Sequence, residues 1–114
     1  MQYDLENRSA IFGADIIAFC NNIKRTEVSR PLISQIVRSA TSIGANYMEA
    51  NQASSRRDFI NKIKICQKEA SETKHWLRMI SYLDESYKQS CRKFWQEAHE
   101  LTLIFSKIAR SSKN

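Results

Sequence analysis

Apolar and small residues recur at alternating steps of four and three along most of this chain, and this spacing restricts the fold more than any other sequence feature. One series consists of Phe59, Ile63, Cys66, Ala70, Thr73, Leu77 and Ile80, and the next of Tyr87, Cys91, Phe94, Ala98, Leu101, Phe105 and Ile108. An α-helix turns once in about 3.6 residues, so each series stays on one face of a helix. The second half of the chain is therefore predicted to form two long amphipathic helices.

The first half repeats the pattern in two shorter series. These are Leu5, Phe12, Ile16, Phe19 and Ile23, and then Ile33, Ile36, Ala40, Ile43, Tyr47 and Ala50. Pro31 suits the first turn of a helix, Ser55 with Asp58 resembles a capping box, and Asp84 is a candidate N-cap. We therefore expect helices over about 3–24, 31–52, 56–82 and 85–110.

Turn-forming residues are scarce, because the 114 residues include two glycines and one proline. This excludes a glycine-rich nucleotide loop and disfavours a β-sandwich, whereas 42% hydrophobic residues suffice for a core. Four helices joined by short loops pack antiparallel to their neighbours. The predicted fold is all-α: a single domain over 1–114 that forms an antiparallel up-down-up-down four-helix bundle.

The sequence predicts a cytoplasmic protein. It has no run of 18 apolar residues, and its first residues lack the layout of a signal peptide. The three cysteines, Cys20, Cys66 and Cys91, form no CxxC pair, which suits a reducing compartment. Cys66 and Cys91 lie in the apolar series, so we expect buried thiols and not nucleophiles.

One pattern resembles a di-iron motif of helical bundles, namely Glu72 with His75, and less closely Gln96 with His99. Metal ligands must point into a bundle, whereas the heptad positions place both histidines on the outer face. A glutamine also replaces the second carboxylate. We therefore expect two solvated histidines, no metal, no cofactor and no enzymatic activity.

Positive charge gathers on the two predicted C-terminal helices. The chain has 18 Lys and Arg against 12 Asp and Glu, a net charge of +6. The residues predicted to share one basic face are Arg56, Arg57, Lys64, Lys68, Lys74, Arg78, Lys88, Arg92 and Lys93, with Lys107, Arg110 and Lys113 near its far end. Such a face suits sugar–phosphate contacts that do not read sequence. From charge alone, a solvated face that keeps the bundle soluble is an equal alternative.

Several apolar residues fall outside the predicted core stripes. Ile11, Ile17, Ile65 and Leu103 fall at outward positions, and Trp76 and Trp95 fall on helix flanks. Together they exceed what one bundle is expected to bury, which predicts self-association through these six residues.

Three segments resemble a known family. They are 35–50, with the pattern R-S-x-T-S-x-G-A-N, then 58–63, and then 69–77, with the pattern E-A-x-E-x-x-x-W-L. They are similar to small bacterial four-helix bundle proteins encoded by intervening sequences of 23S rRNA genes. That family is related to the accessory protein of diversity-generating retroelements. The likeness extends over essentially the whole chain and supports the fold strongly.

The resemblance implies a homopentamer. For the retroelement relatives it also implies a basic surface that binds a reverse transcriptase and its template RNA. The shared pattern singles out the polar signature residues Arg38, Ser39, Asn46, Glu49, Glu69 and Glu72, for which we expect a role in helix register. Two functions follow as hypotheses: an oligomeric scaffold that binds RNA or DNA without sequence preference, or a protein-interaction module that binds no nucleic acid.

Overall fold

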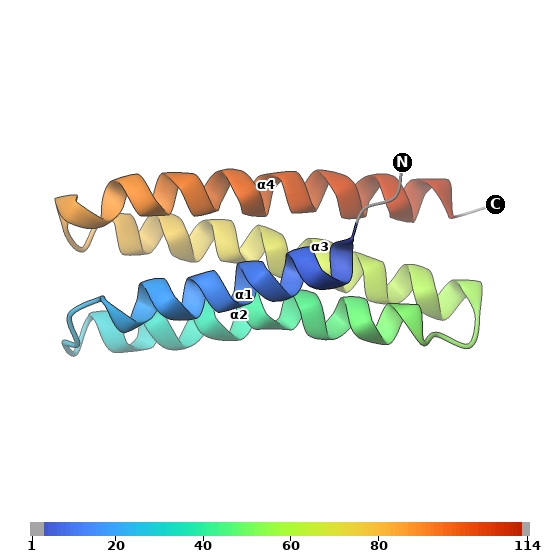
Figure 1. Cartoon of the computed structure of the whole chain (residues 1–114), viewed down its shortest axis with the longest axis horizontal. Helices are drawn as coiled ribbons and strands as arrows, with labels where there is room; N and C mark the ends of the chain where they lie inside the picture. The colour runs from blue at the N-terminus through green and yellow to red at the C-terminus, as the bar shows by residue number, and fades with distance from the viewer. Residues whose placement is uncertain (1–3, 113–114) are drawn as a thin grey trace.

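A computed structural model describes residues 4–112, which form four α-helices and one short 3-10 helix. The helices are α1 (Leu5–Asn21), α2 (Ser29–Asn51), α3 (Arg56–Ser81) and α4 (Lys88–Ser111), with η1 (Glu85–Tyr87) before α4. Consecutive helices run in opposite directions along a bundle of 47 × 23 × 19 Å (Figure 1). The predicted all-α four-helix bundle is confirmed.

Side-chain caps set most helix starts. Ser55 Oγ accepts a hydrogen bond from the backbone N–H of Asp58 at 3.0 Å, and Asp84 accepts one from Ser86 at 2.8 Å, as the sequence predicted. Helix α2 begins two residues before the predicted start, because Thr26 and Ser29 each bond the other's backbone N–H, at 2.9 and 3.0 Å. Helix α1 ends at Asn21 and not near residue 24, and the predicted start at residue 3 lies outside the described residues.

The core consists of the predicted apolar series. Every residue of these series is buried or half-buried, and Ile16, Ile36, Ile63, Leu77 and Phe105 are fully buried. Aromatic rings join α1 to α4, because Phe94 contacts both Phe12 and Phe19 edge-on or tilted, with ring centroids 6.5 and 5.5 Å apart. Periodicity therefore identified the core correctly in all four helices.

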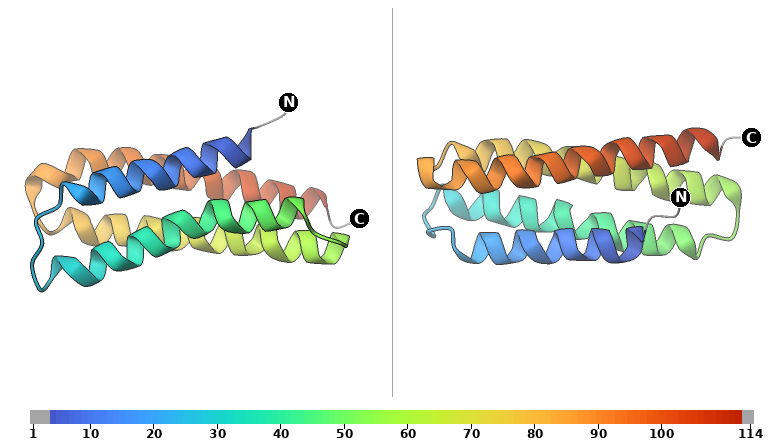
Figure 2. Two further views of the ribbon diagram at one scale, coloured as in Figure 1. Left: turned by 60° about the horizontal axis from the view of Figure 1, so that its bottom comes forward. Right: turned by 45° about the horizontal axis from the view of Figure 1, so that its top comes forward.

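The four helices do not pack with equal closeness. Helices α2, α3 and α4 pack along their lengths, whereas α1 is shorter and contacts α2 far more than α4. The axes of α1 and α4 diverge toward the start of α1 (Figure 2, left). The bundle therefore has a tight α2–α3–α4 part and a looser α1/α4 side.

None of the helices in residues 4–112 has the length and apolar character needed to cross a bilayer.

Candidate nucleic-acid interface

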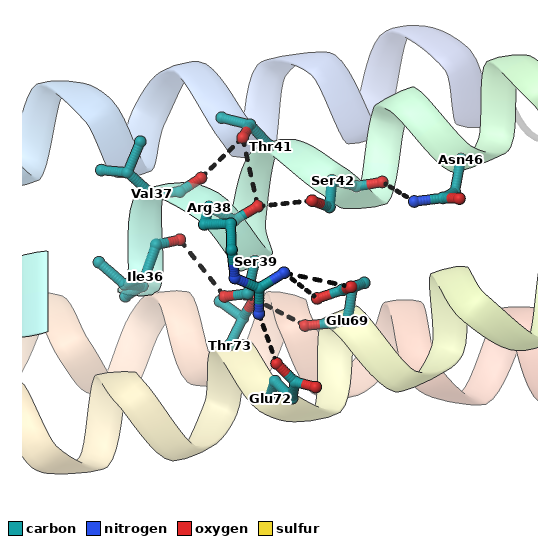
Figure 3. Close-up of polar contacts among 10 residues, drawn as sticks. All are labelled: Ile36, Val37, Arg38, Ser39, Thr41, Ser42, Asn46, Glu69, Glu72 and Thr73. Carbon is teal, nitrogen blue, oxygen red and sulfur yellow. Dashed lines mark hydrogen bonds and ion pairs between the residues drawn. The ribbon is translucent and has the colours of Figure 1, made fainter. Parts of the chain in front are cut away.

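The polar signature residues all make contacts within or between α2 and α3. Arg38 reaches across from α2 and binds Glu69 at 3.2 Å and Glu72 at 2.6 Å (Figure 3). Its hydrogen bonds to these carboxylates, that to Glu69 foremost, raise the pKa of the guanidinium. The Glu69 side chain is 11% exposed, so Arg38 neutralises a nearly buried charge.

Below this ion pair, Ser39 and Thr73 share a buried hydrogen bond of 2.8 Å. Further along α2, Glu49 binds Lys62 of α3 at 2.8 Å, while Asn46 donates to the Ser42 carbonyl of its own helix at 2.8 Å. Three of these contacts join α2 to α3 at two heights, one around Arg38 and Ser39 and one at Glu49 (Figure 3 shows those around Arg38). The signature thus supplies the α2–α3 register inside one chain.

Three predicted basic residues meet in one groove on the outer side of α3. Lys64, Lys68 and Lys74 line it together with Ser71 and His75, and Thr102 of α4 forms its edge; we call this the basic groove. Glu72 also lines it, but its carboxylate is already bound to Arg38. Within residues 4–112, none of the three lysines forms an ion pair; Lys64 and Lys68 are exposed, and Lys74 is half-buried.

Three further basic residues converge where α3 ends and α4 begins. Arg78, Lys88 and Arg92 line a pocket of about 450 Å³ with Trp95, which we call the Trp95 pocket. Two buried side chains, Leu77 and Cys91, also line this pocket. The hairpin turn at η1 brings these residues together, although 14 positions separate Arg78 from Arg92 in the sequence.

The remaining basic residues lie apart. Arg56 lines a small hollow with Ser111 and Ser112 at the opposite end of the bundle, and Arg57 is exposed next to it in α3. Lys93 was predicted on the basic face, and this is wrong: it lines the groove between α1 and α4 with Asp15 and Glu97. One residue on a helix rotates the side chain by about 100°, which separates Lys93 from Arg92. Lys113 lies outside the described residues.

The two histidines have different surroundings. His75 is exposed, as predicted, but His99 is half-buried and stacks on the Trp95 ring at 5.1 Å with an interplanar angle of 16°. The Lys74 ammonium lies 5.0 Å from the centre of the same ring and 3.1 Å from Nδ1 of His99. The expectation of two solvated histidines is therefore wrong for His99, because Trp95 and Lys74 shield it. Among the described residues, no group of three or more His, Cys, Asp or Glu residues is placed to hold a metal ion.

The six off-stripe apolar residues lie on separate faces. Ile11 lines the α1/α4 groove, and Leu103 follows Glu100 of that groove by one turn; both are about half exposed. Ile17 is six residues from Ile11, which is a rotation of about 240° around the helix, so the two side chains point in different directions. Trp95 lines the Trp95 pocket. The outward position predicted for Ile65 is wrong. It is half-buried like Trp76, because the two residues lie one turn before Glu69 and one turn after Glu72 on the α2 side of α3.

Sequence reasoning missed Arg8. Its guanidinium binds Glu97 of α4 through two hydrogen bonds of 2.8 Å and reaches Glu100 at 3.1 Å, which raises its pKa. These residues line the α1/α4 groove together with Asp4 and Asp15. Spacing gives no signal for this pairing, because the partners lie at opposite ends of the chain.

The three cysteines are buried and free, as expected. Burial raises the pKa of Cys20 and Cys91 to about 11 and that of Cys66 to about 12. Such thiols hold their protons at neutral pH and are poor nucleophiles.

Known proteins of similar sequence and structure support the four-helix fold described above. The sequence pattern of the 23S rRNA-intervening sequence protein family matches residues 2–107. A crystal structure of a protein of unknown function from the S23 ribosomal protein family of Bacteroides thetaiotaomicron is similar, with a TM-score of 0.84 and 32% identity. The alignment covers 93% of this chain and 95% of that one. No curated protein matches the chain. With a match over nearly its whole length, the chain belongs to the 23S rRNA-intervening sequence protein family.

Proposed function

We propose that this protein is a non-enzymatic, oligomeric scaffold that binds RNA or DNA through the outer face of α3 and α4, without sequence preference. The observation that carries the proposal is the basic groove. Lys64, Lys68 and Lys74 line one surface, and none of them is engaged by a carboxylate within residues 4–112. Unpaired cations in a row are suited to phosphates, which supply most of the affinity in non-specific binding.

The distribution of acidic residues supports the same face. Asp4, Asp15, Glu97 and Glu100 line the α1/α4 groove, where the cations are Arg8 and Lys93. Four acids against two cations leave this groove with a formal charge of −2, so the bundle separates a more acidic groove from the basic groove, and an approaching polyanion is attracted to the basic groove. A face that merely kept the protein soluble would not need this separation.

Self-association is part of the proposal. Ile11 and Leu103 are 50% and 57% exposed; Ile11 lines the α1/α4 groove, and Leu103 follows Glu100 of that groove by about one turn of α4. Burial of such side chains is favourable by about 25 cal/mol for each Å² removed from water. An oligomer, for which the resemblance to the family implies five copies, would repeat the basic face and let weak phosphate contacts act together.

The α1/α4 groove favours a second candidate function, a protein-interaction module. It combines an exposed aliphatic side chain, Ile11, with several carboxylates, which suits a basic and partly apolar protein partner. In a retroelement role that partner would be a reverse transcriptase. A reverse transcriptase gene and a variable repeat beside this gene would favour that role, and a position inside a 23S rRNA gene would favour the intervening-sequence role.

Titration of labelled, mixed-sequence RNA and DNA by fluorescence anisotropy tests the nucleic-acid proposal. We expect binding to both at about 50 mM salt and a steep loss of affinity by about 200 mM, because phosphate contacts release counterions. Absence of binding to either at the lower salt would overturn the proposal and leave the protein-interaction module.

A further inference from the structure

The Trp95 pocket differs from the basic groove in having an apolar wall. Leu77 and Cys91 are almost completely buried at its base, and the Trp95 side chain forms part of its side. Around them stand the cationic groups of Arg78, Lys88 and Arg92. A volume of about 450 Å³ lies in the range of pockets that take small organic ligands. The pocket therefore joins an apolar surface to a cationic rim.

The rim selects an anion. None of the lining residues is acidic, and Arg92 forms no ion pair within residues 4–112. Arg78 has only a long hydrogen bond of 3.4 Å to the Tyr82 hydroxyl, and Lys88 lies 3.7 Å from Glu85, whose side chain is 87% exposed. Exposed pairs of this kind contribute little, so all three cations are available.

The indole of Trp95 has one covered face and one open face. His99 and Lys74 both lie about 5 Å from the ring centre, and because their nitrogens are 3.1 Å apart, they occupy the same side. His99 lies one turn after Trp95 on α4, whereas Cys91 and Arg92 lie one turn before it. The uncovered face of the indole is therefore the one that borders the pocket.

We propose that the Trp95 pocket binds one unstacked nucleotide of a single-stranded nucleic acid, with its base on the open face of Trp95 and its phosphate held by Arg78 and Arg92. The inference rests on the proposed function and adds a preference for single strands to it. Every base has a π-face that can stack on an aromatic ring, whereas in a duplex both faces of an internal base are already covered. A phosphate alone would make no use of the indole.

Lys74 connects the two sites. It lines the basic groove and also lies over the covered face of Trp95. Together with His99, Lys74 packs against the covered face of the indole. Its charge also extends the series of Lys64 and Lys68 toward the Trp95 pocket. A strand can thus follow phosphate contacts along α3 and place one base in the Trp95 pocket.

The test compares three ligands of equal charge on the wild-type protein by fluorescence anisotropy: a mixed-sequence single strand, the same strand carrying abasic sites, and a duplex with the same number of phosphates. Loss of one stacked base weakens binding about 10-fold, so we expect the intact strand to bind about 10-fold tighter than the abasic strand. Equal binding of the intact and abasic strands would overturn the pocket assignment. It would leave the proposed function standing, because that depends on phosphate contacts and is tested by Lys64→Glu with Lys68→Glu.

Two variants of Trp95 give a second readout. Trp95→Leu should weaken binding of the intact strand about 10-fold and leave duplex binding and the salt slope unchanged, whereas Trp95→Phe should keep most of the preference for the single strand. A free nucleoside monophosphate should displace the labelled single strand only weakly, because it can occupy the Trp95 pocket but makes no contact with the basic groove. An acidic peptide is the last competitor. If it displaced the labelled strand as well as an unlabelled strand does, and if Trp95→Leu did not change this, the pocket would not be a nucleotide site. Circular dichroism checks that both variants remain folded.

Discussion

Arg38 of α2 and Glu69 of α3 form an ion pair at 3.2 Å in which the carboxylate is nearly buried and the guanidinium is half exposed. A buried charge that loses its partner keeps its desolvation cost, so removing the arginine should cost more stability than the exposure of the arginine indicates. Arg38 is therefore more important for stability than its own exposure suggests.

Replacement of Arg38 by Met should reduce the free energy of unfolding by about 1–2 kcal/mol, because the Glu69 carboxylate remains buried without its partner. Urea denaturation followed by circular dichroism measures this. Glu72→Gln is the matched control: Glu72 is more exposed, so the loss should stay below about 1 kcal/mol. Adding Glu69→Gln to Arg38→Met should recover part of the stability, and no recovery would contradict the buried-charge explanation.

Gly13→Ala should stabilise the protein by about 0.5–1 kcal/mol, because alanine is the better helix former. A methyl group there would meet Ala40 and Thr41 at 3.6 Å, an ordinary contact. At Gly44 the same methyl would come within 3.4 Å of Ser9 Oγ, which a 2.6 Å bond to the Leu5 carbonyl holds in place. Thermal unfolding should therefore show a smaller gain for Gly44→Ala, and the reverse order would contradict the packing of α1 on α2.

The three thiols should resist alkylation in the folded protein at pH 8 and react fully in urea, as intact-mass spectrometry can show. Burial raises the pKa of Cys20 and Cys91 to about 11 and that of Cys66 to about 12, so all three stay protonated when folded.

In the unfolded chain, the same thiols lose their protons at a lower pH than in the folded protein. The contribution of the thiols to stability should therefore be constant below about pH 8.5 and fall as pH rises toward 11. A flat profile over that interval would contradict the raised values.

Lys64→Glu with Lys68→Glu should weaken binding of all nucleic acids alike and reduce the salt slope by about 0.9 for each duplex-DNA phosphate that the variant no longer binds. Both side chains face solvent, so the fold should be unchanged. The matched control is Arg30→Glu with Lys93→Glu, which changes the net charge equally on α2 and in the α1/α4 groove. If both double variants weaken binding by the same factor, overall charge and not the basic groove is responsible.

Sedimentation velocity at micromolar concentration should find an oligomer, and Ile11→Asn with Leu103→Asn should dissociate it. Both side chains are at least half exposed, Ile11 in the α1/α4 groove and Leu103 about one turn of α4 after Glu100 of that groove, and their replacement adds no charge. Ile17→Asn, on the other flank of α1, should leave the assembly intact. A monomeric wild-type protein would end this proposal.

Local sequence patterns were sufficient to predict the helices and the core. An apolar stripe has to be buried whatever the rest of the chain does, so the series from Phe59 to Ile80 and from Tyr87 to Ile108 predicted correctly which side chains lie inside. Local chemistry also determined the caps at Ser55 and Asp84, since their partners lie two or three residues away. These features depend only on neighbours along the chain.

Which polar and flanking residues come into contact depends on how the helices pack against one another. The pairing of Arg8 with Glu97 spans almost the whole sequence, and the grouping of Lys74, Trp95 and His99 depends on how two helices rotate against each other. A rotation of one residue, about 100°, was enough to place Lys93 in an acidic groove while Arg92 borders the Trp95 pocket. Helical periodicity determines which face is apolar, but the relative rotation and tilt of whole helices determine what lies beside the edges of that face.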